Sequence, residues 1–99
     1  MKIEFLPPAQ QELDEAFTFY EYQQKGLGKR FVKELKFSIY RIKEFPLAWQ
    51  NITKSTRRCL VKNFPYGVVY QLEKEKIIIV AIANLHRKPN YFFKRLTDV

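Results

Sequence analysis

The feature of this sequence that most constrains its fold is an uninterrupted apolar run near the C-terminal end, Ile77–Ala83. Within it, Ile77–Ile82 is apolar at every position, and most of these residues are β-branched. A short run of this kind is typical of a strand buried on both faces, because a half-buried strand would alternate. The run is also far shorter than the roughly 20 residues that span a bilayer. We therefore expect a central strand over Lys76–Asn84.

The first half of the chain predicts a short strand followed by two helices. Lys2–Leu6 is typical of a strand, and the two prolines after it suit the first turn of a helix. Apolar residues then recur at helical spacing to about Gln24: Ala9, Leu13, Ala16, Phe17 and Tyr20. After the turn KGLGK, a second stripe contains Phe31, Val32, Leu35, Ile39 and Ile42. This helix should end before Pro46, and so short a turn predicts an antiparallel hairpin.

The second half predicts an antiparallel sheet. Residues 47–56 should form a loop in which Trp49 covers the core. The strands that follow are expected at Arg57–Asn63, Val68–Glu73 and Lys76–Asn84, with turns at Phe64–Gly67 and Glu73–Lys76. The fold class is therefore α+β in one domain over residues 1–99. We expect an N-terminal strand, a helix hairpin, a three-stranded antiparallel meander in one sheet, and a short basic helix or tail.

The basic charge of the chain is unevenly distributed. The net charge is +8, with 8 Lys and Arg against 7 Asp and Glu in residues 1–49 and 10 against 3 in residues 50–99. Positive charge gathered in one half predicts an anionic partner such as RNA, DNA or an acidic protein segment. A surface that only keeps the protein soluble explains the charge equally well.

A first group of cations lies on the strand expected at Arg57–Asn63. Strand alternation places Arg58 and Lys62 on one face, roughly 13 Å apart, and Arg57 on the other. Arg58 and Lys62 could therefore bracket two phosphates of a nucleic acid. The alternative is an edge strand that carries cations to prevent aggregation of sheets.

A second group follows the central strand: His86, Arg87, Lys88, Tyr91, Lys94 and Arg95. Arginine can pair with a phosphate through two hydrogen bonds, and an aromatic ring can stack on a base. His86 could move protons near neutral pH or could simply lie at the surface. Tyr91 could also belong to the core, and Lys94 and Arg95 to a solvated tail.

Several classes of protein are excluded by what the sequence lacks. It has no Gly-rich phosphate loop, no HExxH and no GxSxG motif. The single cysteine, Cys59, cannot form an intrachain disulfide, and no Cys/His group has zinc spacing. We therefore expect no metal and no cofactor. The N-terminal stretch does not resemble a signal peptide, which predicts a cytoplasmic protein without a membrane partner.

The order of the expected elements and two motifs together resemble the RelE/ParE superfamily, the toxins of bacterial and archaeal type II toxin–antitoxin systems. The ending LHRKPNYFFKRL is similar to an Arg-x-Pro-x-Tyr pattern after the last strand, carried here by Arg87, Pro89 and Tyr91. Arg95 matches a basic residue that often follows. FPYGVVY, Phe64–Tyr70, is similar to the turn and strand of ParE-like members. The resemblance covers nearly the whole chain.

This resemblance implies a toxin that is silenced by a cognate antitoxin through an acidic segment, with DNA contacted only through the antitoxin. ParE-like toxins poison DNA gyrase and have no established catalytic site. RelE-like toxins are ribosome-dependent mRNA endonucleases, and in that case the catalytic residues would be Arg58, Lys62, Arg87 and Tyr91. A non-toxic module that binds nucleic acid or an antitoxin is a further alternative.

One position favours the ParE-like branch. Gly67 stands where RelE-like nucleases usually carry an arginine that holds the scissile phosphate, and only Lys62 could replace that cation. We therefore predict a growth-blocking toxin that acts on gyrase. The residues predicted to bind the target or antitoxin are Arg57, Arg58, Lys62, His86, Arg87, Lys88, Tyr91, Lys94 and Arg95.

Overall fold

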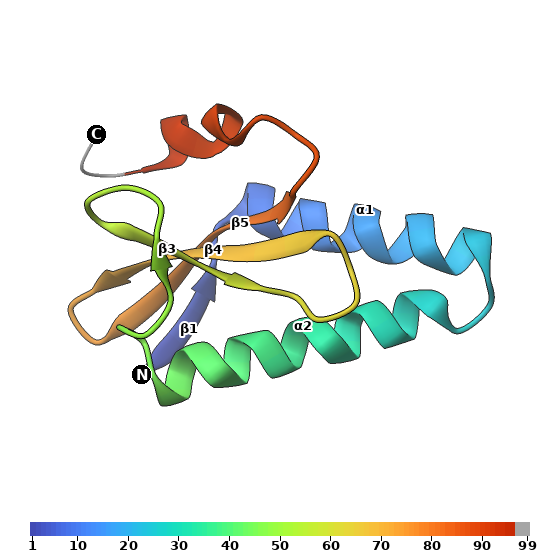
Figure 1. The fold of residues 1–99 in the computed structure, drawn as a ribbon, viewed down its shortest axis with the longest axis horizontal. Helices are drawn as coiled ribbons and strands as arrows, with labels where there is room; N and C mark the ends of the chain where they lie inside the picture. Colours follow the sequence, from blue (N-terminus) through green and yellow to red (C-terminus); the bar gives the residue numbers. More distant parts are fainter. Residues whose placement is uncertain (97–99) are drawn as a thin grey trace.

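The computed structural model describes residues 1–96, without the side chains of Pro89 and Asn90. Its elements in chain order are β1 (Lys2–Phe5), α1 (Pro7–Gln23), α2 (Leu27–Glu44), β2 (Gln50–Asn51), β3 (Thr56–Leu60), β4 (Tyr66–Glu73), β5 (Lys76–Asn84) and the 3-10 helix η1 (Pro89–Arg95). The α+β class and the order of elements confirm the prediction, including a short helix at the basic end (Figure 1). Within this described part, no helix is both long and apolar enough to cross a lipid bilayer.

The strands form one mixed sheet in the order β1-β5-β4-β3-β2. β3, β4 and β5 are the predicted antiparallel meander, and Lys74 and Glu75 connect β4 to β5. β1 pairs with β5 in parallel, with Ile3 opposite Ile77. β5 therefore lies between two strands, as its unbroken apolar sequence predicts.

A tight hairpin joins α1 to α2, and both helices cover the same face of the sheet (Figure 1). Gly26 has φ +89°, a left-handed conformation that glycine adopts without strain. The Glu21 carboxylate accepts hydrogen bonds from the backbone N–H of Gly26 at 2.8 Å and of Gly28 at 3.0 Å. These bonds, that from Gly26 foremost, lower the pKa of Glu21. At Gly28 the helices approach closely, since a Cβ there would lie 2.6 Å from the Phe17 carbonyl oxygen.

Both faces of the sheet are covered, so there are two clusters of buried side chains. The larger lies between the sheet and the helix hairpin and includes Phe31, Leu35, Ile42, Tyr70 and Ile79. The smaller joins the sheet to η1 and contains Val69, Val80, Ala81, Ala83, Phe92 and Leu96. β5 contributes to both clusters. A break in the β4–β5 register at Val69/Tyr70 allows Val80 and Ala81, which are adjacent, to join the same cluster.

Two predicted boundaries were wrong. Residues 47–56 are not entirely a loop, because β2 pairs there with β3. The third predicted strand, Arg57–Asn63, ends at Leu60, and Lys62 lies in the following turn. Strand alternation therefore does not extend from Arg58 to Lys62. Beside Arg57 and Arg58, β2 is the outer strand, so their interpretation as edge-strand cations was also wrong.

Trp49 has the role that the sequence predicts. It is half-buried and packs against the larger cluster. Its indole N–H donates a hydrogen bond to the Arg41 carbonyl oxygen at 3.4 Å. Trp49 therefore joins the end of α2 to the connection that follows it and covers one side of the core.

Candidate interaction site at the end of strand β5

Two arginines and a tyrosine from separate parts of the chain meet where β5 ends. Arg87 follows β5 in the turn that leads to η1, and Tyr91 belongs to η1. The guanidinium carbon of Arg87 lies 3.8 Å from the centroid of the Tyr91 ring, a cation–π contact. Arg58 of β3 lines the same small pocket as both. We call Arg58, Arg87 and Tyr91 the arginine cluster.

Gly67 and Gln50 determine where the Arg58 side chain lies. A Cβ on Gly67 would lie 2.8 Å from both Cγ and Cδ of Arg58, so the arginine stem crosses directly over the glycine. Nη2 of Arg58 donates a hydrogen bond to Oε1 of Gln50 at 3.2 Å. The Nε–H of Arg58 is buried and has no hydrogen-bond partner within residues 1–96. A buried donor without an acceptor costs free energy, so an anion at this point would satisfy it.

The pocket beside the arginine cluster is small and has mainly apolar walls. Its volume is about 70 Å³, and its lining includes Ile52, Val69, Ala83, Leu85 and Phe92. Apolar walls lower the local dielectric constant and strengthen the attraction between a guanidinium and an anion. The pocket can therefore accept a carboxylate or a phosphate oxygen from a partner.

Arg95 is engaged inside the fold. Its two terminal nitrogens donate to the two carboxylate oxygens of Glu12, each at 3.0 Å, and Nη1 also donates to the Val80 carbonyl oxygen at 3.0 Å. Oε1 of Glu12 accepts the backbone N–H of Ile82 at 3.0 Å. The Arg95 and Glu12 side chains are only 18% and 13% exposed. Together they occupy the edge of β5 beyond the end of β1, where no strand of the described chain lies.

Tyr91 is held between the two arginines of this region. The Arg95 guanidinium carbon lies 5.3 Å from its ring centroid, farther than that of Arg87. Burial, with a smaller contribution from the Glu12 carboxylate, raises the pKa of Tyr91 to about 12. Its hydroxyl therefore stays protonated at neutral pH and can donate a hydrogen bond.

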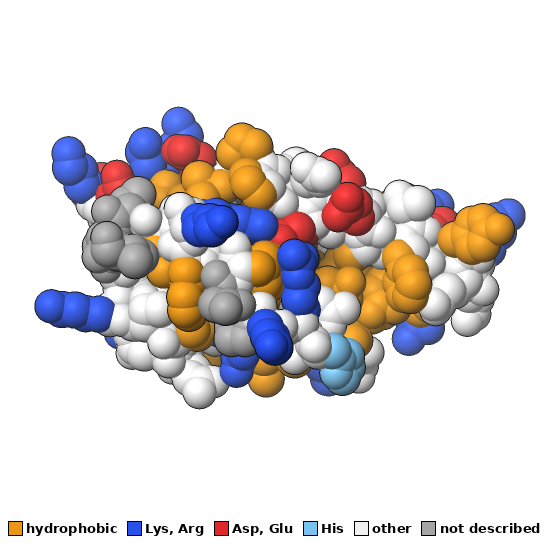
Figure 2. All heavy atoms as spheres, turned by 90° about the horizontal axis from the view of Figure 1, so that it is seen from above, with side chains coloured by type: hydrophobic (Ala, Val, Ile, Leu, Met, Phe, Trp, Pro, Cys, Tyr) orange, Lys and Arg blue, Asp and Glu red, His pale blue; other side chains and the backbone are white. Residues whose placement is uncertain are grey.

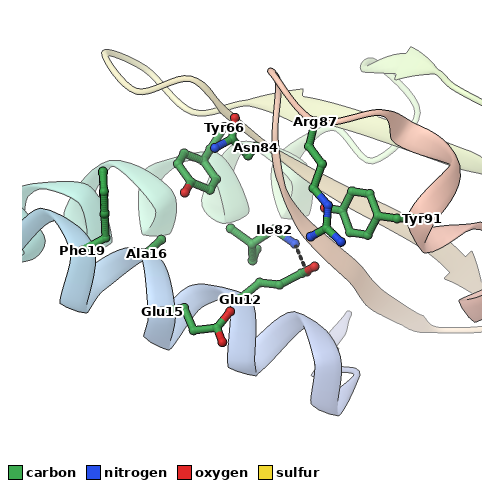
Figure 3. A pocket seen from close by; sticks show the side chains of 9 residues that line it. All are labelled: Glu12, Glu15, Ala16, Phe19, Tyr66, Ile82, Asn84, Arg87 and Tyr91. Atoms are coloured by element: carbon green, nitrogen blue, oxygen red, sulfur yellow. Dashed lines mark hydrogen bonds between the residues drawn. The ribbon is translucent and has the colours of Figure 1, made fainter.

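A larger groove opens on the α1 side of the arginine cluster (Figure 3). Its volume is about 390 Å³, and it is lined by Glu12, Glu15, Ala16, Phe19, Tyr66, Ile82, Asn84, Arg87 and Tyr91. We call it the edge groove, because it follows the open edge of β5. Figure 2 shows acidic, basic and hydrophobic side chains close together on this side of the molecule. Arg87, Tyr91 and Asn84 line both the edge groove and the small pocket, so the two hollows are continuous.

The family model for the ParE toxin of type II toxin–antitoxin systems, parDE, matches residues 3–91. The chain belongs to this family. It is therefore a toxin of a type II toxin–antitoxin system, which has a cognate antitoxin as its partner. The resemblance to the RelE/ParE superfamily and its ParE-like branch is confirmed.

A solved chain of the chromosomal ParDE toxin–antitoxin system from P. aeruginosa has the same fold as this ParE-family toxin. The TM-score is 0.75, and the similarity covers 86% of this chain and 96% of that chain at 12% sequence identity. At this identity the similarity concerns the fold alone. A search of curated protein sequences gives no match to the chain.

The remaining predicted site residues of the toxin lie apart from the arginine cluster. Arg57 donates from Nη1 to the carbonyl oxygens of Leu47 and Trp49, at 3.0 and 2.8 Å, and so holds the connection after α2. Exposed cationic or titratable side chains that line neither the edge groove nor the small pocket are Lys62, His86, Lys88 and Lys94. The sequence therefore identified Arg58, Arg87 and Tyr91 as neighbours, whereas Lys62 is not brought to them.

Sequence reasoning missed the importance of Glu12. This acid lies between two buried alanines of α1, Ala9 and Ala16. Small residues on either side of an acid permit close approach of a helix to a strand, and that spacing was the available signal. Gln50 and Asn84 were missed as well, because only the pairing of the strands brings them to the site. Among residues 1–96, no three His, Cys, Asp or Glu side chains gather in a way that could hold a metal ion.

Proposed function

We propose that this toxin blocks growth by binding DNA gyrase through the arginine cluster, and that it does so without a catalytic reaction of its own. A cognate antitoxin with an acidic segment would silence it by covering the same side of the molecule. The net charge of +8 favours an acidic partner for this surface.

The observation that supports this proposal most is the position of Gly67. The stem of Arg58 fills the space over this glycine, at the position where RelE-like nucleases usually carry a further arginine. Cleavage of RNA by its 2′-hydroxyl needs cations to stabilise the transition state and a group that accepts a proton. Lys62 lies in the turn after β3 and does not line the pocket. Tyr91, with a pKa of about 12, is a poor base at neutral pH.

The alternative is a ribosome-dependent mRNA endonuclease of the RelE type. The closeness of Arg58, Arg87 and Tyr91 favours it, because two guanidiniums beside a phenol could hold a phosphate and donate a proton. In that case Lys62 would have to move toward the pocket when RNA binds. A non-toxic module that only binds an antitoxin or nucleic acid is the remaining possibility.

Induction of the toxin in cells, alone and together with its antitoxin, tests the proposal. We expect growth arrest only without the antitoxin. Purified toxin should then inhibit supercoiling by gyrase or trap linear plasmid, and Arg87→Ala should lose this effect. Lys88→Ala, which removes a neighbouring exposed cation outside the pocket, serves as the matched control.

Primer extension on mRNA from the same cells distinguishes the alternatives. Discrete cuts within translated codons that disappear in Arg87→Ala would overturn the gyrase proposal in favour of the endonuclease. Normal growth at matched protein levels, with gyrase unaffected, would support the non-toxic module instead.

A further inference from the structure

The open edge of β5 beside the edge groove offers hydrogen-bonding groups to one kind of neighbour only. β1 pairs with β5 no farther than Ile79, and Ile82 and Asn84 then face the uncovered edge. The Ile82 N–H is bonded to Glu12 and the Asn84 carbonyl accepts the Arg87 N–H at 3.1 Å. This leaves the Ile82 carbonyl and the Asn84 N–H facing the groove.

These two groups fit a parallel neighbour and not an antiparallel one. In an antiparallel pair, each bonded residue uses its own N–H and its own carbonyl, and here one of the two is already occupied at both Ile82 and Asn84. In a parallel pair, one residue of the neighbour donates to the carbonyl of one residue and accepts from the N–H two residues later. Ile82 and Asn84 supply this arrangement, on the line along which β1 pairs with β5.

The side chains around this edge differ on the two faces of the sheet. On the helix side, Phe19 and Ala16 of α1 and Tyr66 of β4 make an apolar floor (Figure 3). Phe19 is 55% exposed, so much of its ring is available to a partner. On the other side, Arg87 lies over the Tyr91 ring with its guanidinium at the mouth of the groove (Figure 3).

Charge in the groove favours an acid at one end only. Glu12 is neutralised by the two hydrogen bonds from Arg95, whereas Arg87 has no carboxylate hydrogen-bonded to it among the described residues. Glu15 is exposed on the α1 wall and would repel a second acid placed near it. A bound segment with a carboxylate at Arg87 therefore has a preferred register.

We propose that the edge groove binds an extended segment of the antitoxin that pairs in parallel with β5, through a dipeptide of one acidic and one large apolar residue. The residue opposite Ala83 forms both main-chain hydrogen bonds and points its carboxylate at Arg87. Its neighbour points to the opposite face, because successive side chains of a strand alternate, and packs on Phe19 and Tyr66. The inference rests on the proposed function for the protein that carries the segment, but the groove geometry is independent of the target.

Selection from a random dodecapeptide display library on the immobilised full-length toxin tests this inference without the antitoxin or gyrase. We expect selected peptides to share an acidic residue directly beside a large apolar one. Binding of the synthetic peptides should weaken about tenfold or more in Phe19→Ser and in Arg87→Gln. The matched controls are Tyr22→Ser, a 93% exposed aromatic of the same helix, and Lys88→Gln, both outside the groove.

Methylation of single peptide nitrogens tests the strand pairing. A methyl group on the nitrogen of the acidic residue should abolish binding, whereas one on the adjacent apolar residue should leave affinity nearly unchanged. Binding should also slow hydrogen exchange at the Asn84 amide. Failure to select any peptide, binding that is insensitive to Phe19→Ser, or a helical bound peptide would each overturn the inference. Toxicity and its relief by the antitoxin could still be observed in that case, so failure of this inference is distinguishable from failure of the proposed function.

Discussion

At the scale of single residues, the toxin uses two of its C-terminal cations in opposite ways. Arg87 is exposed and stacked on Tyr91, where a partner can reach it. Arg95 is withdrawn from solvent and takes the place of a missing strand beside β5, since it donates to the Val80 carbonyl while its partner Glu12 accepts from Ile82. Charge type in the sequence therefore does not separate a binding residue from a structural one.

The replacement Arg95→Ala should destabilise the fold more than any other removal of a C-terminal cation. It leaves the Glu12 carboxylate and the Val80 carbonyl without their donor in a mostly buried position. We expect the free energy of unfolding to fall by about 2 to 3 kcal/mol, measured by denaturant titration. Lys94→Ala, next to it and exposed, should change it by less than about 0.5 kcal/mol. Equal effects of the two replacements would contradict the structural role of Arg95.

The replacement Gly67→Ala should move Arg58 with little loss of stability. The added Cβ would lie 2.8 Å from two carbons of the Arg58 stem, which must therefore shift. The stability should change by about 1 kcal/mol or less, the scale of strand propensities. Side-chain NMR of Arg58 should show a displaced Nε–H signal, and Gly26→Asn should leave that signal in place. An unchanged Arg58 signal in Gly67→Ala would mean that the glycine does not position it.

At the scale of elements, the helix hairpin is closed by a carboxylate and two glycines. Glu21, near the end of α1, binds the backbone N–H groups at the start of α2, where negative charge is favourable. Gly28 then permits the close approach of α2 to the Phe17 carbonyl of α1. The turn KGLGK predicts the hairpin, but the acid that completes it is five residues away from its nearer partner, Gly26.

The Glu21 interaction predicts a pH dependence of stability. A carboxyl whose pKa is lowered by folding stabilises the folded state above its unfolded pKa and loses this contribution as the pH falls through the folded pKa. Glu21→Gln should therefore melt at a lower temperature than the wild type at neutral pH, and the difference should close below the ordinary glutamate pKa of 4.5. Thermal unfolding of both proteins across this range measures it. A difference that persists in acid would show that Glu21 stabilises the hairpin by packing instead.

At the scale of the whole molecule, the sheet needs η1 as well as the helix hairpin. The smaller cluster is closed by Phe92 and Leu96, which pack on the face of β5 and β4 turned away from the helices. The same segment carries Tyr91 of the arginine cluster. The arginine cluster and the smaller core are therefore coupled through one short element.

Phe92→Ala tests the structural role of η1. Phe92 is 1% exposed, so we expect a loss of about 3 to 5 kcal/mol in the free energy of unfolding. Tyr22→Ala, at 93% exposure on α1, should have an effect smaller than about 0.5 kcal/mol. A tolerated Phe92→Ala would mean that the sheet is stable without this cover.

By itself, the sequence determined the class and order of elements, because apolar periodicity, prolines and glycines act locally along the chain. Ile77–Ile82 predicted a strand buried on both faces, and Phe45-Pro46 the end of the second helix. The tertiary structure alone decided which charged side chains meet. Glu12 and Arg95 lie 83 positions apart and pair beside β5, and Gln50 reaches Arg58 only because β2 pairs with β3. Lys62 left the predicted face because β3 ended early. Long-range pairing depends on strand register and helix packing, and neither is written in the local pattern of residues.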